Sequence, residues 1–306
     1  VGGPRGGRVT TRTLPAAAEA RPLSVAADYV RLTKPRIISL LLVTTAGAMF
    51  VAAGGVPDGW LLFWTMVGGY LAAGGANAIN HYVDRDIDGR MSRTTGRPVV
   101  AGRVPPARAL AFGVALGALS ALVLGVFANW LAAALALLGL ALYVGVYTLW
   151  LKRTTVHNIV IGGSAGAVPP LVGWAAVTGD LGLMAFVLFA IVFYWTPPHF
   201  WALALILERD YAAAGVPMLP VVRGEAETRR QILLWTLVMV AVTLLPVVSG
   251  AAGAFYLASA LALGAVFCGL ATLLARDGGL RWARATFHYS LLYLALIFVA
   301  LAIDAA

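Results

Sequence analysis

Residues 59–88 read GWLLFWTMVGGYLAAGGANAINHYVDRDID, an uncharged run of 25 residues that ends in a cluster of acids. An α-helix needs roughly 20 apolar residues to cross a bilayer, so the run predicts a membrane-spanning helix. Carboxylates close to a membrane are scarce and costly. The acids Asp84, Asp86 and Asp88 therefore indicate that a polar site lies where this helix ends.

The composition of the whole chain extends this prediction. Of 306 residues, 61% are hydrophobic and 11% are charged, whereas a soluble domain carries about 25% charged residues. Most of the chain must therefore face lipid or other helices, and we expect an all-α polytopic membrane protein. The one cysteine, Cys268, lies in an apolar run, which excludes a disulfide framework and a cysteine-based metal cluster.

The apolar runs predict nine transmembrane helices. Two of the runs are of double length and are expected to divide at Asn129 and at residues 249–253. The runs are 37–57, 59–83, 109–151, 156–179, 181–207, 231–275 and 285–303.

The basic residues are confined to one side of this arrangement. All 22 Lys and Arg lie before residue 37 or in alternate loops, and the loops near Asp58, Asn129, Asp180 and Ser249 contain none. The positive-inside rule then places the N-terminus and the charged loops in the cytosol, in a multi-pass protein of the cell (inner) membrane. The net charge of +9 thus reflects topology and does not indicate nucleic acid.

Two regions are expected along the chain. Residues 1–27 are rich in Arg, Ala and Gly and predict a flexible basic tail, with a transit peptide as the alternative. Residues 28–306 are expected to form one nine-helix membrane domain.

An acidic stripe lies at the end of the second predicted span. Asn80, Asp84 and Asp88 follow one another at intervals of four, which places them on one face of a helix. Mg²⁺ commonly takes one or two carboxylates and completes its shell with water and substrate phosphates. The three residues are predicted to be catalytic and to bind the metal; the alternative is that they cap the helix and pair with nearby cations.

A second acidic segment follows the sixth span on the same side. Glu208 and Asp210 are predicted as further metal ligands, although a spacing of two suits one helix face poorly. The alternative is a solvated helix end.

Cations surround both segments. Arg93 and Arg97 follow the stripe, and Tyr147, Lys152 and Arg153 close the fourth span. Guanidinium forks match phosphate oxygens, so Arg93, Arg97, Arg153 and Tyr147 are predicted to bind a diphosphate and Lys152 to act in catalysis. For Lys152 and Arg153 a purely topogenic role stays open.

Several longer segments resemble the UbiA superfamily of intramembrane prenyltransferases, and within it the branch that acts on haem. The resemblance covers about residues 28–304 and rests on the segments 32–36 (LTKPR), 77–88, 97–98, 151–154, 158–163, 169–171, 198–201 (PHFW), 210–211 and 217–222. It implies nine helices around a lipid-open cavity. It also places the family's first metal–diphosphate motif on Asn80, Asp84 and Asp88, and its second at residues 208–210, where many members have a D-x-x-x-D that this chain lacks.

The resemblance also implies a reaction. A farnesyl group would pass from farnesyl diphosphate to the vinyl group of haem b (protohaem IX), giving haem O, with Mg²⁺ as the only cofactor. The implied partners are these two substrates, the lipid bilayer and a downstream haem-modifying membrane enzyme, without nucleic acid.

Four residues are predicted to contact the acceptor: His199, His81, Asn158 and Trp201. Imidazole is a common ligand of haem iron. The pair Pro197–Pro198 predicts a break in the sixth span beside His199, which would open this helix toward the cavity.

Three alternatives stay open. A sister prenyltransferase would use the same metal site on an aromatic quinone precursor or a chlorin. A divalent-ion transporter is disfavoured because the acids cluster on one side and none lies at mid-membrane depth. A passive haem-binding scaffold would bind haem without turnover.

Overall fold

The computed structural model describes residues 22–305, and every regular element in that range is a helix. The elements are α1 (Pro22–Thr33), α2 (Pro35–Ala53), α3 (Gly59–Val83), α4 (Arg85–Asp88), α5 (Pro106–Phe127), α6 (Trp130–Ala141), the π-helix η1 (Leu142–Leu151), α7 (Lys152–Thr154), α8 (Asn158–Gly162), α9 (Ser164–Thr178), α10 (Leu183–Ile206), α11 (Glu208–Ala213), α12 (Leu219–Thr243), α13 (Leu245–Val248), α14 (Ala254–Asp277) and α15 (Gly279–Ala305).

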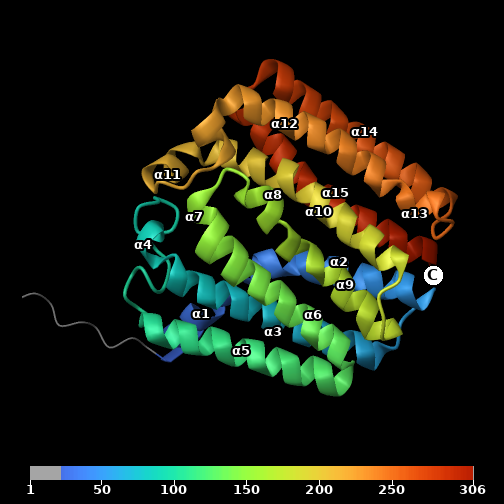
Figure 1. Cartoon of the computed structure of the whole chain (residues 1–306), viewed down its shortest axis with the longest axis horizontal. Helices are drawn as coiled ribbons and strands as arrows, with labels where there is room; N and C mark the ends of the chain where they lie inside the picture. The colour runs from blue at the N-terminus through green and yellow to red at the C-terminus, as the bar shows by residue number, and fades with distance from the viewer. Residues whose placement is uncertain (1–21, 306) are drawn as a thin grey trace, which may run out of the picture.

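The long helices lie side by side in one bundle (Figure 1). Helix α3 packs on α5, α2 on α9, and α10 on both α12 and α15. The short helices α4, α7 and α11 gather at one end of the bundle, and α13 and the C-terminus lie at the other (Figure 1). We call the first of these the α4 end.

The membrane prediction is confirmed. Eight helices, or runs of consecutive helices, are long and apolar enough to cross a bilayer, and they match eight of the nine predicted spans. The remaining span is α3, whose 25 residues extend about 37 Å and thus exceed a hydrocarbon core of roughly 30 Å. Its glycines and the polar Asn77, Asn80 and His81 lower its mean hydropathy.

Two of the three predicted helix breaks are present in the structure, and one is not. Asn129 begins α6 as expected: its side chain accepts a hydrogen bond from Ala132 N and donates one to the carbonyl of Ala175 at 2.7 Å. The turn at residues 249–253 separates α13 from α14 as expected. The predicted break at Pro197–Pro198 is wrong, because α10 continues through both prolines. The prolines remove the N–H donors to the carbonyls of Phe193 and Tyr194, and membrane helices tolerate such losses where neighbouring groups satisfy the backbone.

The predicted tail is shorter than expected at its C-terminal end. Helix α1 begins at Pro22, so residues 22–27 are helical and continue into the membrane domain. The rest of the predicted tail, residues 1–21, lies outside the described residues.

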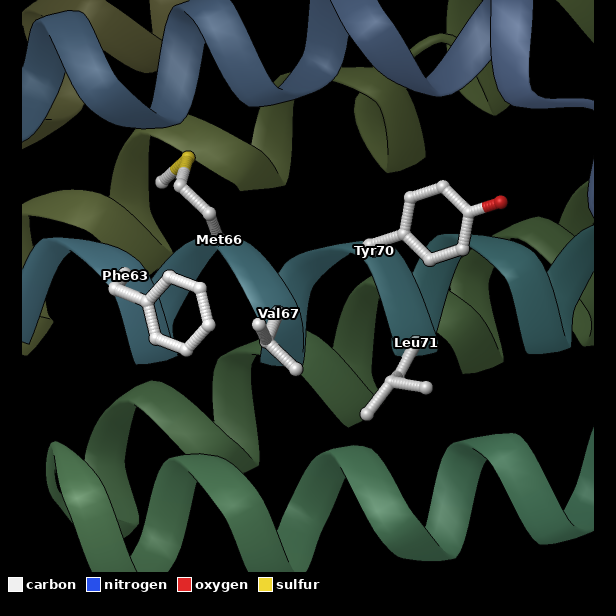
Figure 2. Close-up of a pocket in the computed structure, with 5 residues that line it drawn as sticks. All are labelled: Phe63, Met66, Val67, Tyr70 and Leu71. Atoms are coloured by element: carbon white, nitrogen blue, oxygen red, sulfur yellow. The ribbon is translucent and has the colours of Figure 1, made fainter.

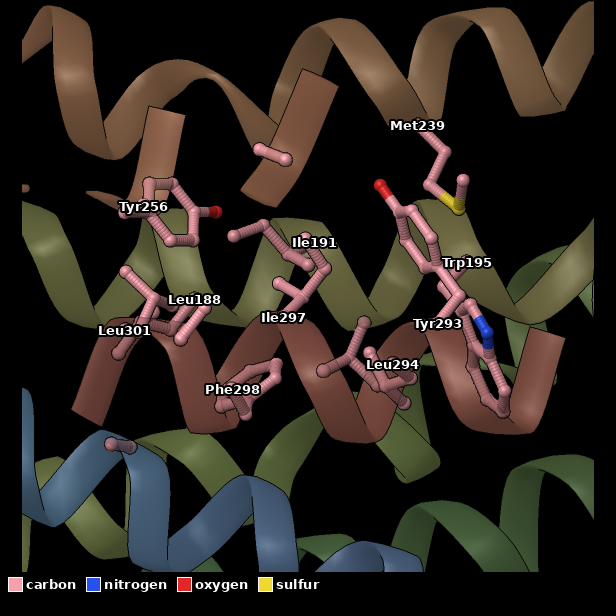
Figure 3. Close-up of a cluster of buried hydrophobic side chains, with 14 of the residues drawn as sticks. Leu188, Ile191, Trp195, Met239, Tyr256, Tyr293, Leu294, Ile297, Phe298 and Leu301 are labelled. Atoms are coloured by element: carbon pink, nitrogen blue, oxygen red, sulfur yellow. The ribbon is translucent and has the colours of Figure 1, made fainter. Parts of the chain in front are cut away.

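The largest buried cluster joins α10, α12, α14 and α15 (Figure 3). Its buried tyrosine hydroxyls are satisfied: Tyr256 donates to the carbonyl of Thr243 at 2.7 Å, and Tyr293 to the Thr243 hydroxyl at 3.0 Å. Lipid tails are as apolar as these side chains, so close packing and internal hydrogen bonds hold membrane helices together.

Helices α3 and α5 touch through glycine. A Cβ atom on Gly113 would lie 2.6 Å from Ile79 Cγ1 and 2.8 Å from the carbonyl oxygen of Gly75. Real Cβ atoms essentially never come so close, so the contact requires glycine on α5. It also fixes the last turns of α3, which carry Asn80 toward the α4 end.

Substituting this glycine should therefore loosen the bundle. We expect Gly113→Leu to lower the apparent Tm of the detergent-solubilised protein by several degrees, because overpacking costs about 1–3 kcal/mol or more. Gly269→Leu on α14, where a Cβ meets no atom within 4 Å, is the matched control. Heating followed by size-exclusion chromatography measures both; equal stability of the two variants would contradict the close α3–α5 contact.

Candidate functional site

The predicted acidic stripe is formed as expected. The backbone N–H of Asp84 donates to the carbonyl of Asn80 at 2.9 Å, and that of Asp88 to the carbonyl of Asp84 at 2.8 Å. The helical path thus continues from α3 into α4 and keeps the three residues on one face. Asp84 and Asp88 are fully buried and Asn80 is 3% exposed, so all three point into the protein.

Each acid of the stripe has a basic partner. Lys152 Nζ contacts Asp84 Oδ2, and Arg97 Nη1 contacts Asp88 Oδ2. The structure thus brings Lys152 and Arg97 into contact with the stripe. Burial raises the pKa of Asp88 above its ordinary value, against the attraction of Arg97.

Arg153 is held by an acid outside the stripe. Its guanidinium makes two hydrogen bonds to Asp86, of 2.7 and 2.8 Å, and lies 3.5 Å from Asp84 Oδ1. The hydrogen bonds from Arg153 lower the pKa of Asp86 to about 2. Asp86 therefore fixes Arg153 beside Asp84.

Sequence reasoning missed Lys34 as a site residue. Its Nζ donates a 2.8 Å hydrogen bond to Asn80 Oδ1, which brings the start of α2 to the stripe. Lys34 is the one non-glycine residue with positive φ (55°) in the described part of the chain, a conformation that costs roughly 1–2 kcal/mol. Burial, followed by the nearby Arg97 and Lys152, holds the pKa of Lys34 well below its ordinary value. In the sequence, the one local signal for Lys34 is the Lys-Pro pair at the start of the first predicted span. This pair indicates a topogenic charge and forms part of the family resemblance, but it does not indicate a site residue.

The π-helix η1 explains how Tyr147 and Lys152 are placed. The Thr148 hydroxyl donates to the carbonyl of Tyr143, five residues earlier, at 2.8 Å, and Asn80 Nδ2 lies 3.3 Å from the same hydroxyl. In a π-helix, residues five apart share a face, and such segments frequently occur at functional sites. Tyr147 thus lies one π-turn before Lys152, with its ring against Gly162 of α8.

The second acidic segment has a different role from the one predicted. Asp210 Oδ1 accepts hydrogen bonds from the backbone N and the hydroxyl of Ser92, at 3.2 and 2.9 Å. Although its slight burial opposes the shift, these bonds hold the pKa of Asp210 below its ordinary value. Asp210 therefore braces the loop that carries Arg93, whose guanidinium lies 5.6 Å from the Tyr211 ring centre.

The predicted five-residue metal set is not assembled. Within residues 22–305, no three His, Cys, Asp or Glu side chains come together as a metal site, so Glu208 and Asp210 do not join the stripe. Asn80 also differs from the prediction: its oxygen accepts from Lys34 and its Nδ2 donates to Asp84 Oδ2 at 2.7 Å. Asn80 thus connects Lys34 to Asp84.

The two aspartates nevertheless fit a divalent cation. Asp84 Oδ1 and Asp88 Oδ1 are buried, and neither has a hydrogen-bond partner in the part of the chain that the structure describes. A buried oxygen without a partner costs about 1–3 kcal/mol, more when charged. Two carboxylate oxygens without hydrogen-bond partners in the described range, of which that of Asp84 lies 3.5 Å from Arg153, match the protein contribution that Mg²⁺ commonly needs when substrate phosphates supply the rest.

The four predicted acceptor residues have different packing and hydrogen-bond partners. His199 Nδ1 is 2.7 Å from the Ser290 hydroxyl, and its ring stacks on Trp195 and Phe287, so it faces α15. Asn158 Nδ2 donates to the carbonyls of Thr155 and Pro217, at 2.8 and 3.3 Å.

The other two are buried near different partners. Trp201 packs edge-on against Trp235. His81 is 3% exposed, and neither of its ring nitrogens has a hydrogen-bond partner among the described residues. The four side chains therefore lie in different local environments.

A cavity of about 240 Å³ lies along α3 and is separate from the charged residues. It is lined by Phe63, Met66, Val67, Tyr70 and Leu71 (Figure 2). All five come from α3, none is charged, and the last lies more than two turns before Asn80. This apolar groove suits lipid rather than a diphosphate.

Comparison with known proteins agrees with this geometry. Residues 40–301 match the UbiA prenyltransferase family. The chain belongs to this family.

Several similar relatives share one name, protoheme IX farnesyltransferase. That of Roseiflexus sp. (strain RS-1) is 56% identical over 94% of this chain and 53% of its own length, and that of Chloroflexus aurantiacus is 58% identical over 92% and 48%. The chain thus spans about half the length of these relatives. It covers 91% of the relative from Gloeobacter violaceus, which is 56% identical over 90% of this chain.

Solved structures of UbiA-type proteins have the same fold. A digeranylgeranylglyceryl phosphate synthase aligns with a TM-score of 0.75 at 17% identity, over 92% of this chain and 98% of its own. A UbiA homolog from Archaeoglobus fulgidus bound to DMAPP and Mg²⁺ aligns with a TM-score of 0.66 at 16% identity, over 90% and 99%. The all-helical bundle is therefore the fold of the family.

The pairing at Asp88 can be tested without substrate. We expect Arg97→Gln to lower the apparent Tm, because breaking a buried pair costs roughly 3 kcal/mol or more. Adding Asp88→Asn should restore part of the loss by removing the unpaired charge. Arg90→Gln, at an exposed arginine of the same loop, is the control. If the decreases in apparent Tm caused by Arg97→Gln and by Asp88→Asn simply add in the double variant, the two side chains do not interact.

Proposed function

We infer that this chain transfers the farnesyl group of farnesyl diphosphate to the vinyl group of haem b, giving haem O, with Mg²⁺ as cofactor. The family and the name shared by its similar relatives support this function. The single observation that carries it is the pair of buried carboxylates, Asp84 and Asp88. Each lies beside a cation, and each has one oxygen without a hydrogen-bond partner within residues 22–305.

The charge of the site matches this substrate. Lys34, Arg97, Lys152 and Arg153 contribute four positive charges, and Asp84, Asp86 and Asp88 three negative ones, which leaves one positive charge. A divalent ion raises this to three, and a fully ionised diphosphate ester carries three negative charges. When bound, Mg²⁺ supplies Lewis-acid neutralisation of the diphosphate oxygens.

The cations of the chain act on the leaving group. As the bond between C1 of the farnesyl chain and oxygen breaks, the electron pair leaves with the diphosphate, and Lys34, Arg97 and Lys152 stabilise the charge that develops there. Fixed cations stabilise a developing negative charge far more strongly in a site that excludes water than they would in solution. Arg153, which lies 3.5 Å from Asp84 Oδ1, is proposed to complete the diphosphate site together with Arg93 and Tyr147.

The remaining steps involve the acceptor. The allylic cation adds to the outer vinyl carbon of haem, and water captures the resulting cation beside the ring and loses a proton, which gives the hydroxyl. The farnesyl chain stays in the apolar bundle, so the product remains in the membrane. A downstream haem-modifying membrane enzyme is therefore the proposed recipient.

His199 is the best supported of the proposed haem contacts. The Ser290 hydroxyl donates to the carbonyl of Phe287 at 2.6 Å, so it accepts from His199, whose Nδ1 must carry the proton. His199 Nε2 then keeps its lone pair, the form that binds iron. His81, Asn158 and Trp201 are proposed as further contacts of the acceptor.

The metal assignment is tested by Asp84→Asn. Membranes are incubated with haem b, farnesyl diphosphate and Mg²⁺, and the hydroxyethylfarnesyl product is detected by mass spectrometry. We expect a loss of at least about 100-fold, the scale of removing one electrostatic contact from a transition state, and the same loss in wild type after chelation. Asp180→Asn, in the exposed α9–α10 loop, should keep full activity.

The outcomes separate the alternatives. Full turnover by Asp84→Asn would remove the metal assignment. Prenylation of 4-hydroxybenzoate or a chlorin in place of haem would keep the metal site and change the acceptor. Haem binding without turnover would favour the passive scaffold.

We also propose that the α4 end faces the cytosol in the cell membrane, because the basic loops lie there. In a Cys268→Ser background, Gly96→Cys and Asp180→Cys report the two ends, and a Cβ at Gly96 meets no atom within 4 Å. A membrane-impermeant maleimide should label Asp180→Cys in intact cells and Gly96→Cys only after permeabilisation. The reverse pattern would invert the topology.

A further inference from the structure

Arg229 on α12 lies outside the site described above and lacks a partner. Its Nε is buried without a hydrogen-bond acceptor, and in residues 22–305 its guanidinium takes part in no hydrogen bond or ion pair. Buried polar groups are nearly always satisfied, and an exception indicates an unseen water or ion. The guanidinium therefore points to a missing oxygen-bearing partner.

The neighbouring turn makes room for this side chain. Gly278 and Gly279 join α14 to α15 with φ of 67° and 82°, a region that favours glycine. A Cβ on Gly278 would lie 3.0 Å from Arg229 Cζ and would collide with Nη1. The glycine thus allows the guanidinium to lie directly against the turn.

Within the described residues, Arg229 also forms no ion pair with Glu225 of its own helix. Glu225 precedes it by four residues, the spacing that favours a Glu–Arg pair. The ion pair observed on α12 within the described range joins Arg230 to Glu227 instead. Glu225 is exposed, so Arg229 is oriented by its surroundings and not by this carboxylate.

A cavity of about 70 Å³ lies beside the guanidinium. Its walls come from α10, α12, α14 and α15, and its lining residues are Leu205, Glu225, Arg229, Leu274, Gly279, Leu280 and Ala283. A water occupies roughly 30 Å³ of liquid, so there is room for about two waters or one small oxyanion. Arg229 is the one cation in this lining.

We propose that this cavity binds a phosphate-type oxyanion through the guanidinium of Arg229. A planar guanidinium is well suited to such a group because its N–H donors match paired phosphate oxygens. The oxyanion is either free phosphate or the headgroup of an anionic phospholipid. Exposed Arg276, Arg281 and Arg284 lie on the adjoining ends of α14 and α15 and attract anions of both kinds, while Glu225 and the exposed Asp277 oppose them.

The test measures ligand-dependent stability of the purified full-length protein in neutral detergent. Inorganic phosphate is titrated in one series, and phosphatidylglycerol, with phosphatidylcholine as the uncharged reference, in another. We expect at least one of the two anions to raise the apparent Tm of wild type by several degrees, because binding to the folded state stabilises it. Arg229→Gln should lose this shift, and Arg223→Gln, at an exposed arginine of the same helix, should keep it.

The two titrations distinguish a lipid headgroup from free phosphate, and they also show whether the proposal is wrong. A shift with phosphatidylglycerol alone assigns a lipid headgroup, and a shift with phosphate as well assigns a small oxyanion. Glu225→Gln should lower the anion concentration needed for half the shift, because it removes a repelling charge. The absence of any shift, or an equal shift in Arg229→Gln, would overturn the proposal.

A further result would also overturn it. If Glu225→Gln lowers the Tm without ligand and leaves the anion response unchanged, Arg229 and Glu225 form an ordinary ion pair. None of these readouts depends on prenyl transfer, so the outcome is independent of the proposed function.

Discussion

The contact between Lys152 and Asp84 is the interaction on which the α4 end depends. A carboxylate with no exposure is stable only beside a countercharge, so Asp84 draws η1 toward α3. Asn80 extends the pairing by one residue, because its NH₂ donates to Asp84 and its oxygen accepts from Lys34 at the start of α2. Three segments from distant parts of the sequence thus meet at one carboxylate. An apolar bundle alone would not specify this meeting point, because lipid solvates apolar helices as well as their neighbours do.

The rest of the bundle keeps this end in position. The glycine contact between α3 and α5 fixes the height and rotation of α3, and the π-helix aligns Tyr147 with Lys152. Asp86 and Asp210 also stabilise this end of the bundle. Asp86 holds Arg153 beside the stripe, and Asp210 connects the loop of Arg93 to α11 through Ser92. The sequence predicts Asp210 as a metal ligand, and in the structure both acids hold cations in place. A preorganised arrangement of this kind spares the reaction the cost of reorienting charges.

Much of this arrangement could be predicted from the sequence, for identifiable reasons. The spans follow from uncharged runs, and the stripe follows from a period of four that helix geometry maintains from Asn80 to Asp88. Lys34 was missed because its role depends on a left-handed residue between two helices, and no local pattern in the chain signals that conformation. Helix α10 continues through Pro197–Pro198, because a membrane helix tolerates proline in a packed setting that the local sequence does not signal. The orientation of the Asn80 amide depends on Lys34 and Asp84 together. It was not predicted, because the sequence pattern considers only the amide oxygen of an asparagine as a metal ligand and not its NH₂ group as a hydrogen-bond donor.

The unpaired groups are as informative as the paired ones. Asp84 and Asp88 each use Oδ2 for a close contact with a cation. Within residues 22–305 their Oδ1 atoms are buried without a hydrogen-bond partner, and that of Asp84 lies 3.5 Å from Arg153. If the cluster served only to cap a helix, rotation of the carboxylates or a nearby hydroxyl would satisfy these oxygens at little cost, as Thr148 and Thr196 do elsewhere in the bundle. The four cations around three acids also leave a surplus positive charge, which pairing alone does not explain. Both imbalances disappear together when a divalent ion meets the two Oδ1 atoms and a trianionic diphosphate meets the cations. The charges of the site are thus arranged for a complex, and the protein by itself carries only part of it.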